Sequence, residues 1–138
     1  MGSLIAAILV IGIPLAVYVV STAKRPEYFP EEYQQALGRN CIDWGADLVI
    51  GHHPHVLQGI EKYNGVYIVY SLGNFCFGGN STPSDMDTMI FQQTFYVKNG
   101  KLLKKNDVKV IPCSISSVSS TNNFQPTPLS GSSKKRVI

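Results

Sequence analysis

The stretch "PEEYQQALGRNCIDWGADLVIG", residues 30–51, decides the fold class. Pro30 suits the first position of a helix, and the two glutamates after it favour a helix start because carboxylates complement the positive end of the helix dipole. Apolar side chains then recur at helical spacing until Gly45, which suits a helix end. The apolar run "DLVIG" comes next and is typical of a strand covered on both faces. We therefore predict an α/β unit with a helix over Pro30–Gly45 and a strand over Asp47–Ile50.

Two antiparallel hairpins are predicted after this unit. Asn64-Gly65 and Asn99-Gly100 each separate two strand-like runs, and both residue types tolerate the positive φ that a two-residue turn requires. Between the hairpins, "GGNSTPSDMDT" at residues 78–88 has the composition of a surface loop. From Ser114 onward the chain is polar and rich in Ser and Pro, so we expect a partly extended or disordered tail.

The composition fits one small domain. The chain has 138 residues, 12 basic and 9 acidic side chains and a formal net charge of +3. Part of this charge lies in the C-terminal run Lys134–Arg136, and the sequence lacks the dense basic surface of a nucleic-acid binder, so we expect no nucleic-acid partner. The cysteines Cys41, Cys76 and Cys113 lie far apart among apolar residues, which predicts small core residues rather than a zinc knuckle or a disulfide framework.

The first segment is apolar. Leu4–Val20 carries no charge and is followed by Lys24 and Arg25, which predicts an uncleaved membrane anchor in a leader of residues 1–25 and a membrane-anchored protein at the cell surface. These basic residues also favour a cytoplasmic location for the C-terminal side of the segment, which opposes that orientation. The alternative is a buried strand, because Pro14 interrupts the run and "AVYVVS" is rich in β-branched residues. With residues 1–25 as an anchor, residues 26–129 form the domain and residues 130–138 a polar, basic tail.

All three histidines of the chain lie within the nine residues "GHHPHVLQG". His53 and His55 are two apart after the predicted strand, so in an extended stretch both imidazoles would point the same way and could bind one metal ion. The carboxyl end of a strand is also where sites gather in α/β sheets. The alternative is that they cap a turn and bond to the backbone. Because every histidine is at this one place, we favour metal binding by His53 and His55, with His52 pointing to the opposite face.

The segment "GADLVIGHHPHVLQGIEKYNGVYIVYSLGNFCFGGN", residues 45–80, closely resembles the bacterial capsule-synthesis CapA family, also called the poly-γ-glutamate biosynthesis protein family. A weaker resemblance extends over residues 26–129, which corresponds to the C-terminal part of a family domain. The family is similar to the calcineurin-like metallophosphoesterases. The resemblance therefore implies part of an α/β/β/α sandwich with C-terminal antiparallel hairpins, whose complete form binds a pair of divalent metals.

The resemblance also implies roles for single residues. His53 and His55 match the metal-ligand loop, so a weakly bound Mn, Zn or Fe ion is expected. Glu61 falls on the acidic position after the histidines and would orient a ligand imidazole through a hydrogen bond. Ser71 and Asn74 fall on the "SLGN" turn. Like His52, they would be further polar neighbours of the metal or the substrate. Asn74 is equally well explained as a turn residue.

Several family features are absent from the sequence. "TAK", residues 22–24, stands where the family has His-Trp-Gly, and the family's earlier Asp and Asn-His segments are also missing. A two-metal site needs ligands from several strands, so we expect an incomplete, metallophosphatase-like hydrolase site. The implied function is biosynthesis or export of a capsule or poly-γ-glutamate polymer, with the polymer or its synthesis complex as partner. The alternatives are a non-catalytic membrane-tethered scaffold or polymer-binding protein, and a truncated gene remnant.

Overall fold

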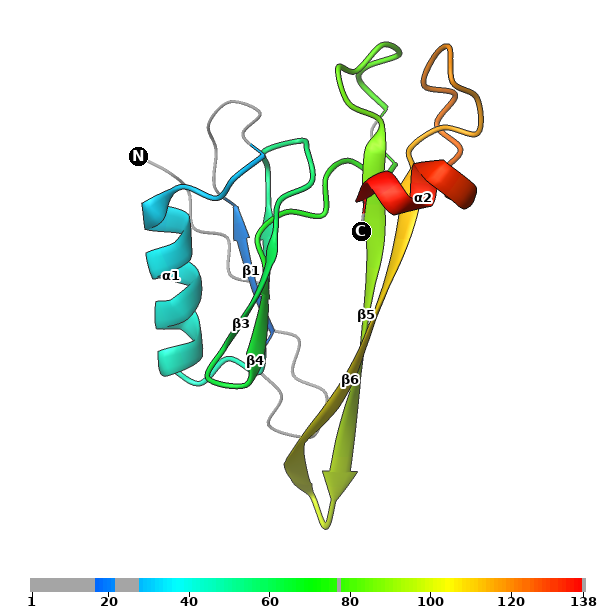
Figure 1. The fold of residues 1–138 in the computed structure, drawn as a ribbon. Helices are drawn as coiled ribbons and strands as arrows, with labels where there is room; N and C mark the ends of the chain where they lie inside the picture. Colours follow the sequence, from blue (N-terminus) through cyan, green and yellow to red (C-terminus); the bar gives the residue numbers. More distant parts are fainter. Residues whose placement is uncertain (1–16, 22–27, 77, 138) are drawn as a thin grey trace.

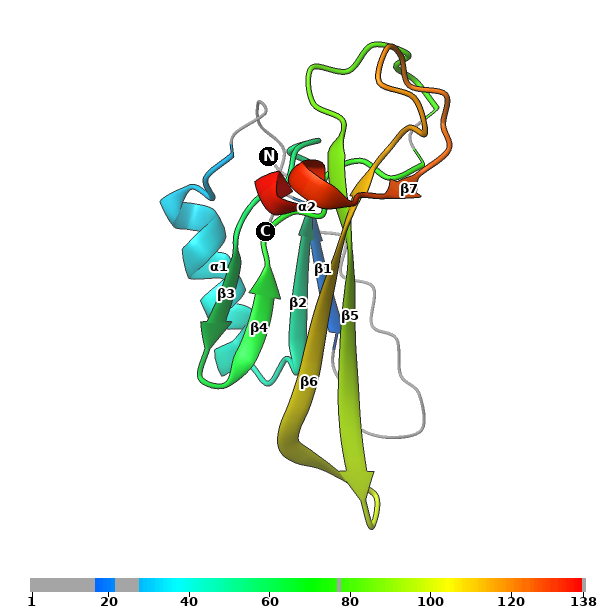
Figure 2. The same ribbon diagram turned by 45° about the vertical axis from the view of Figure 1, so that its right-hand side comes forward.

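A computed structural model describes residues 17–21, 28–76 and 78–137 as two sheets and two helices (Figure 1). The elements are β1 (Val17–Ser21), α1 (Glu32–Asp43), β2 (Leu48–His52), β3 (Ile60–Tyr63), β4 (Val66–Val69), β5 (Asp87–Lys98), β6 (Lys101–Ser114), β7 (Thr127–Pro128) and α2 (Gly131–Val137). The first sheet has the order β1-β2-β4-β3 and the second has the order β5-β6-β7. Helix α1 lies against one face of the first sheet and the β5–β6 hairpin against the other, which gives three layers (Figures 1 and 2).

The predicted α/β unit is present, with a shorter helix than predicted and a strand that begins at Leu48 and extends to His52. Strands β1, β2 and β4 run parallel, and β3 joins β4 antiparallel. Helix α1 begins after Glu31, whose backbone N–H donates to Oε1 of Gln34 at 2.8 Å, and this reciprocal cap sets the start two residues after Pro30. Gly45 has φ 102°, a conformation that ends a helix and suits glycine.

The core lies between α1 and the first sheet. Its buried members are Cys41, Ile42, Ala46, Val49, Ile68 and Tyr70. Gly38 lets the helix approach the sheet closely, since a Cβ at this position would lie 2.9 Å from Cγ2 of Ile68. Across the sheet, the rings of Tyr67 and Phe91 lie 6.1 Å apart and link the first sheet to β5.

Both predicted hairpin turns are confirmed. Asn64 and Gly65 have φ values of 49° and 85°, and Asn99 and Gly100 have values of 52° and 72°. The positive φ of both central residues matches the right-handed twist of the strands that each turn joins. The loop predicted over residues 78–88 ends earlier, because β5 begins at Asp87.

Part of the predicted anchor is a strand of the sheet. Val17–Ser21 pairs with β2 from Val17 opposite Leu48 to Ser21 opposite His52, so the strand alternative holds for these residues. The rest of the predicted anchor, residues 4–16, lies outside the described residues. Among the helices that the structure describes, none has the length and apolar character needed to cross a membrane.

Two further sequence expectations need correction. The C-terminal tail is partly extended, as predicted, since Thr127–Pro128 forms β7, but Gly131–Val137 forms the helix α2, which the sequence did not indicate. The hydroxyl of Ser116 donates to the backbone oxygen of Thr121 at 2.7 Å, and this polar contact lies next to the buried side chain of Ile115. Cys76 is exposed rather than part of the core, whereas Cys41 and Cys113 are buried as predicted.

Candidate metal-binding site

The histidine segment and the "SLGN" turn leave neighbouring parallel strands at the same edge of the first sheet. The histidines follow β2, and Ser71–Asn74 follow β4, which pairs with β2 through Val49 and Ile68. Gly51 brings these two segments together, since a Cβ at this position would lie 2.1 Å from the backbone oxygen of Tyr70. No residue other than glycine fits this approach without a shift of the backbone. The sheet thus sets the spacing between the two segments.

The two predicted ligand residues have an unusual backbone. His53 has φ 104° and His55 has φ 63°, so the chain turns at both and is not the extended stretch that we expected. The argument from alternating side chains therefore does not apply. The imidazole rings of His53 and His55 nevertheless lie 5.3 Å apart, centroid to centroid, at an interplanar angle of 54°. Positive φ in a residue other than glycine is costly and is concentrated at functional sites.

This ring separation fits two ligands of one ion. With metal–nitrogen bonds of about 2 Å and a tetrahedral angle at the metal, two imidazole centroids lie about 5 Å apart. Within the described part of the chain, no group of three or more His, Cys, Asp and Glu residues is placed to hold an ion. The described residues therefore fit two positions of a metal site and leave the others to water or to another segment.

Asn74 contacts one of the two imidazoles. Its Oδ1 lies 2.8 Å from Nδ1 of His55, and its side chain is buried. If His55 Nδ1–H donates this bond, the lone pair of the neutral ring is on Nε2, which is the arrangement of a histidine that binds a metal through Nε2. Ser71 has a different role, because its hydroxyl accepts from the backbone N–H of Gly73 at 3.2 Å and so shapes the turn that presents Asn74.

Glu61 does not orient a histidine, which corrects the expectation from the sequence. Its carboxylate accepts from Nε of Arg39 at 2.9 Å and from the hydroxyl of Tyr70 at 2.5 Å. Burial raises the pKa of Glu61, but the bonds from Arg39 and Tyr70 and the charge of Arg39 outweigh it, so the pKa lies below its ordinary value. Glu61 is on β3 and joins α1 to the sheet, so it is a structural residue.

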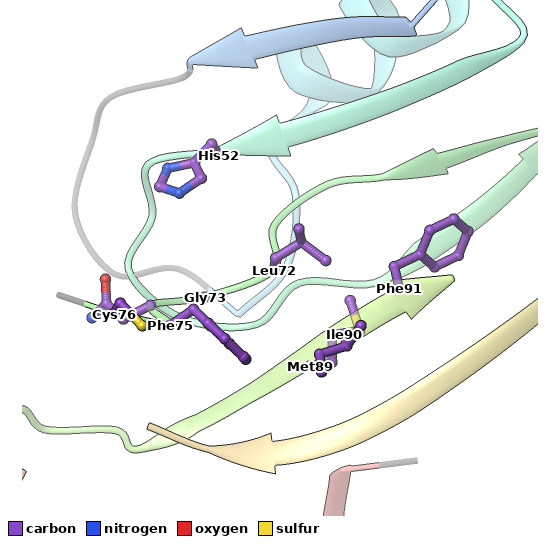
Figure 3. Close-up of a pocket in the computed structure, with 9 residues that line it drawn as sticks. His52, Leu72, Gly73, Phe75, Cys76, Met89, Ile90 and Phe91 are labelled. Atoms are coloured by element: carbon purple, nitrogen blue, oxygen red, sulfur yellow. The ribbon is translucent and has the colours of Figure 1, made fainter. Parts of the chain in front are cut away.

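His52 borders a cavity of about 370 Å³ between the end of β2, the loop with Phe75 and Cys76, and strand β5, and neither His53 nor His55 is among the residues that line it (Figure 3). Burial lowers the pKa of His52, and positive charge on His55 and His53 lowers it further. At neutral pH the imidazole of His52 is therefore uncharged, at the edge of a mainly apolar cavity.

A second cavity brings in a residue that the sequence did not indicate. His55 and Asn74 border a space of about 240 Å³ together with Ser84 and Asp85 from the loop before β5. Asp85 already accepts from the backbone N–H of Asp87 at 2.8 Å. The sequence of this Ser- and Pro-rich loop did not indicate that Asp85 lies near His55, because a loop sequence does not determine where the loop folds.

Comparison with known proteins shows which family this part of the chain is similar to. Residues 13–79 match the family described as "Bacterial capsule synthesis protein PGA_cap". The match covers slightly less than half of the chain. The matched segment contains β1, α1, the whole first sheet, the histidine segment and Asn74.

Individual relatives agree with this assignment. The chain is 46% identical over 71 residues to "PGA biosynthesis protein CapA" of Bacillus subtilis (strain 168), which covers 51% of this chain and 18% of that protein. It is 49% identical over 61 residues to "Capsule biosynthesis protein CapA" of Bacillus anthracis, which covers 43% of this chain and 15% of that protein. The chain thus spans less than a fifth of the length of these curated relatives.

Proposed function

We propose that this chain is part of a PGA_cap protein that serves the biosynthesis or export of a capsule polymer of the poly-γ-glutamate kind, and that His53 and His55 bind one divalent metal ion weakly. The observation that carries the metal site is the pair of rings 5.3 Å apart with Nδ1 of His55 at 2.8 Å from Asn74. Imidazole nitrogen suits Zn, Mn and Fe, so one of these is the expected ion. The names of the two Bacillus relatives, a PGA biosynthesis protein and a capsule biosynthesis protein, support the proposed role in polymer biosynthesis.

The likeness to the calcineurin-like metallophosphoesterases is part of this proposal. The described residues supply a helix and two sheets, which correspond to three layers of an α/β/β/α sandwich. A bound divalent ion would lower the pKa of a water molecule and polarise a phosphoester or amide oxygen. His53 and His55 would hold that ion through their imidazoles, and Asn74, with its Oδ1 accepting from Nδ1–H, would keep the proton of His55 on Nδ1.

Two protein ligands are fewer than the three that catalytic zinc sites use, so we expect negligible turnover by this chain alone. The same observation favours a second candidate function, a non-catalytic scaffold or polymer-binding protein. Membrane attachment at the cell surface remains a prediction for residues 4–16, because Val17–Val20 belongs to β1.

Titration with zinc or manganese tests the proposal. The unmodified chain should take up the metal weakly, and the double variant His53→Ala, His55→Ala should lose this uptake. His52→Ala is the matched control, since it removes an imidazole from the same segment and should leave uptake unchanged. Asn74→Ala should weaken uptake about tenfold, which is the usual effect of losing a partner that orients a metal ligand.

Two results would contradict the proposal. Equal uptake by the double variant and the unmodified chain would remove His53 and His55 as ligands. Rapid phosphodiesterase turnover by the unmodified chain would show that the site is complete and that the limit of two protein ligands is wrong.

A further inference from the structure

Strand β5 is an edge of the second sheet. Within the described residues it pairs with β6 on one side and with no strand on the other (Figures 1 and 2). It has twelve residues, whereas the edge strands of the first sheet, β1 and β3, have five and four. An unpaired edge presents backbone N–H and C=O groups to which a further strand can bind.

The free edge of β5 lacks the features that usually block such pairing. Between Asp87 and Lys98 its ten residues include no charged residue, no proline and no glycine. Strand β6 is different. Among the described residues it is also open on one side, since β7 pairs only with Cys113 and Ser114, but it contains five charged residues and Pro112. Charge and proline protect an edge strand from association, so β5 is the more open of the two.

Alternate residues of β5 direct their backbone groups to this free edge. The amide of Ile115 donates to the oxygen of Met86 at 2.9 Å, so the even-numbered residues of β5 bond to β6 as this ladder continues. The amide of Leu129 donates to the oxygen of Pro112 at 2.8 Å, which agrees, because Pro112 lies opposite Met89 and its oxygen points away from β5. The odd-numbered residues therefore point N–H and C=O outward, namely Met89, Phe91, Gln93 and Phe95.

The side chains of β5 match themselves when the strand is read in reverse about Gln93. Two β5 strands from two copies of the chain can be paired antiparallel with this residue at the centre. The opposed pairs are then Gln93 with Gln93, Gln92 with Thr94, Phe91 with Phe95, and Ile90 with Tyr96. Each pair joins two polar residues or two aliphatic or aromatic ones, and no like charges meet. A centre at Gln92 instead would place Phe91 opposite Gln93.

Gln93 has an unsatisfied amide at the centre of this register. Its Nε2 and Oε1 are both buried, and neither has a hydrogen-bond partner in the part of the chain that the structure describes. A buried polar group without a partner is costly. Directly opposed residues of an antiparallel pair have Cβ atoms about 5 Å apart on the same face, so two Gln93 side chains can form reciprocal amide hydrogen bonds. Pairing of two copies would thus satisfy both atoms.

The same register would cover apolar surface along the edge. Ile90 is 41% exposed, and the cavity beside His52 is lined by Met89, Ile90 and Phe91 but by no residue of β6 (Figure 3). Strand β6 therefore does not cover this cavity. In the paired arrangement, Phe95 and Tyr96 of the second copy come opposite Phe91 and Ile90, at the border of the cavity.

We infer that two copies of this chain associate through β5, as an antiparallel pair with a twofold axis at Gln93. The same edge serves both copies, so the assembly closes as a dimer. The outward backbone groups of Phe91, Gln93 and Phe95 then form about six hydrogen bonds between the copies. This surface lies outside the proposed metal site and does not depend on it.

Sedimentation velocity of the full chain from about 1 μM to about 1 mM tests the inference. A chelator is present, so that a shared metal ion cannot link two copies. The variants Gln92→Lys, Thr94→Lys and Gln92→Glu, Thr94→Glu each place two pairs of like charges across the axis on exposed positions. Each should raise the dissociation constant of the dimer about tenfold. An equimolar mixture of the two should restore association, because opposite charges then meet.

The two variants are matched within their own hairpin. Gln92 lies opposite Lys109 and Thr94 opposite Asp107, so each variant gains one favourable and one unfavourable pair there. Ser119→Lys, Ser120→Lys is the control for net charge, since it adds two lysines to exposed positions outside β5 and should associate as the unmodified chain does. Thermal unfolding checks that each variant folds.

Amide hydrogen exchange locates the contact. The amide protons of Phe91, Gln93 and Phe95 should exchange slowly only at concentrations at which the dimer forms, because their partner is the second copy. Those of Gln92 and Thr94 should exchange slowly at all concentrations, because they bond to β6.

Four outcomes would overturn the inference. The first is a chain that stays monomeric at about 1 mM. Equal weakening by the control variant would mean that net charge alone governs association. Failure of the mixture to restore the dimer would exclude the register at Gln93, and association beyond a dimer would exclude a closed pair.

Discussion

Residues far apart in sequence meet throughout the first sheet, whereas the β5–β6 hairpin pairs residues along two strands joined by one tight turn. In the first sheet, Arg39 of α1 reaches Glu61 of β3, and Gly51 lies against the backbone of Tyr70. In the hairpin, contacts follow the register from Lys98 opposite Lys101 to Asp87 opposite Ser114. The PGA_cap match ends at residue 79, before the hairpin begins.

This difference separates two ways of placing side chains. The histidines and Asn74 are placed by buried packing and by backbone contact, so changes deep in the first sheet should disturb them. The hairpin side chains are placed by the pairing of two strands, which shifts register between Phe95 and Val97, and its lysines at 98, 101, 104 and 109 stay exposed. Substitutions in the first sheet test how strongly its stability depends on these buried contacts.

The largest effect is expected at Gly51. Gly51→Ala places a Cβ 2.1 Å from the oxygen and 2.8 Å from the carbonyl carbon of Tyr70, so β2 and β4 must move apart. The free energy of unfolding should fall by about 3 kcal/mol or more, measured by urea denaturation. Gly59→Ala is the matched control, since a Cβ there meets no atom within 4 Å, and it should be nearly neutral. Tolerance of Gly51→Ala would show that the two ligand segments are not held by this contact.

An intermediate effect is expected at Tyr70. Its hydroxyl donates to Glu61 from a buried position, so Tyr70→Phe should cost about 1–2 kcal/mol at neutral pH. The bonds from Arg39 and Tyr70 hold the pKa of Glu61 below 4.5, so the stabilisation is present above this value and is lost as pH falls below it. Burial and the bond to Glu61 raise the pKa of Tyr70 above 10.0, so stability is also lost as pH rises beyond that value.

The urea concentration at the midpoint of unfolding, measured from about pH 3 to about pH 11, checks both the acid and the alkaline loss of stability. In Tyr70→Phe the alkaline loss should disappear and the acid loss should shrink. An unchanged alkaline arm in this variant would mean that another group titrates there and that the link between β3 and β4 carries less of the stability than we assign to it.

The smallest effect is expected at the strained histidine. His53 has φ 104°, so His53→Gly should be about 1 kcal/mol more stable than His53→Ala, since both remove the ring but only glycine accepts this backbone without strain. His52 is the control, because it ends β2 in an ordinary strand conformation and there the glycine variant should be less stable than the alanine variant by about 0.5–1 kcal/mol. The same sign at both positions, in urea denaturation, would mean that the backbone at His53 is not strained.

The sequence predicted the features that depend on neighbouring residues. Both Asn-Gly turns were found because their φ requirement is a property of two adjacent residues, and α1 was found because its cap and its apolar spacing are also local. Glu61 was misplaced because its partners, Arg39 and Tyr70, come from other elements. The order of the C-terminal segment was missed for the same reason, since Arg136 docks on Asp87 through a contact that no composition reveals.

At the candidate site, the residue types were visible and the geometry was not. His53 and His55 could be named from their place after a predicted strand, and Asn74 from the family resemblance, and His55 and Asn74 are in contact. The positive φ values of the histidines could not be predicted, because only crowding in the folded chain imposes them. Asp85 was missed because its loop returns to the histidines only in three dimensions.

The parallel pairing of β1 with β2 also sets an order of events in time. A hairpin such as β5–β6 can close in about 1–10 μs, because its strands follow each other directly. The pairing of Val17 with Leu48 joins residues that α1 separates in the sequence, and such non-local contacts are slow to form. In refolding of the complete chain, the hairpin is therefore expected to become ordered before the histidines meet Asn74.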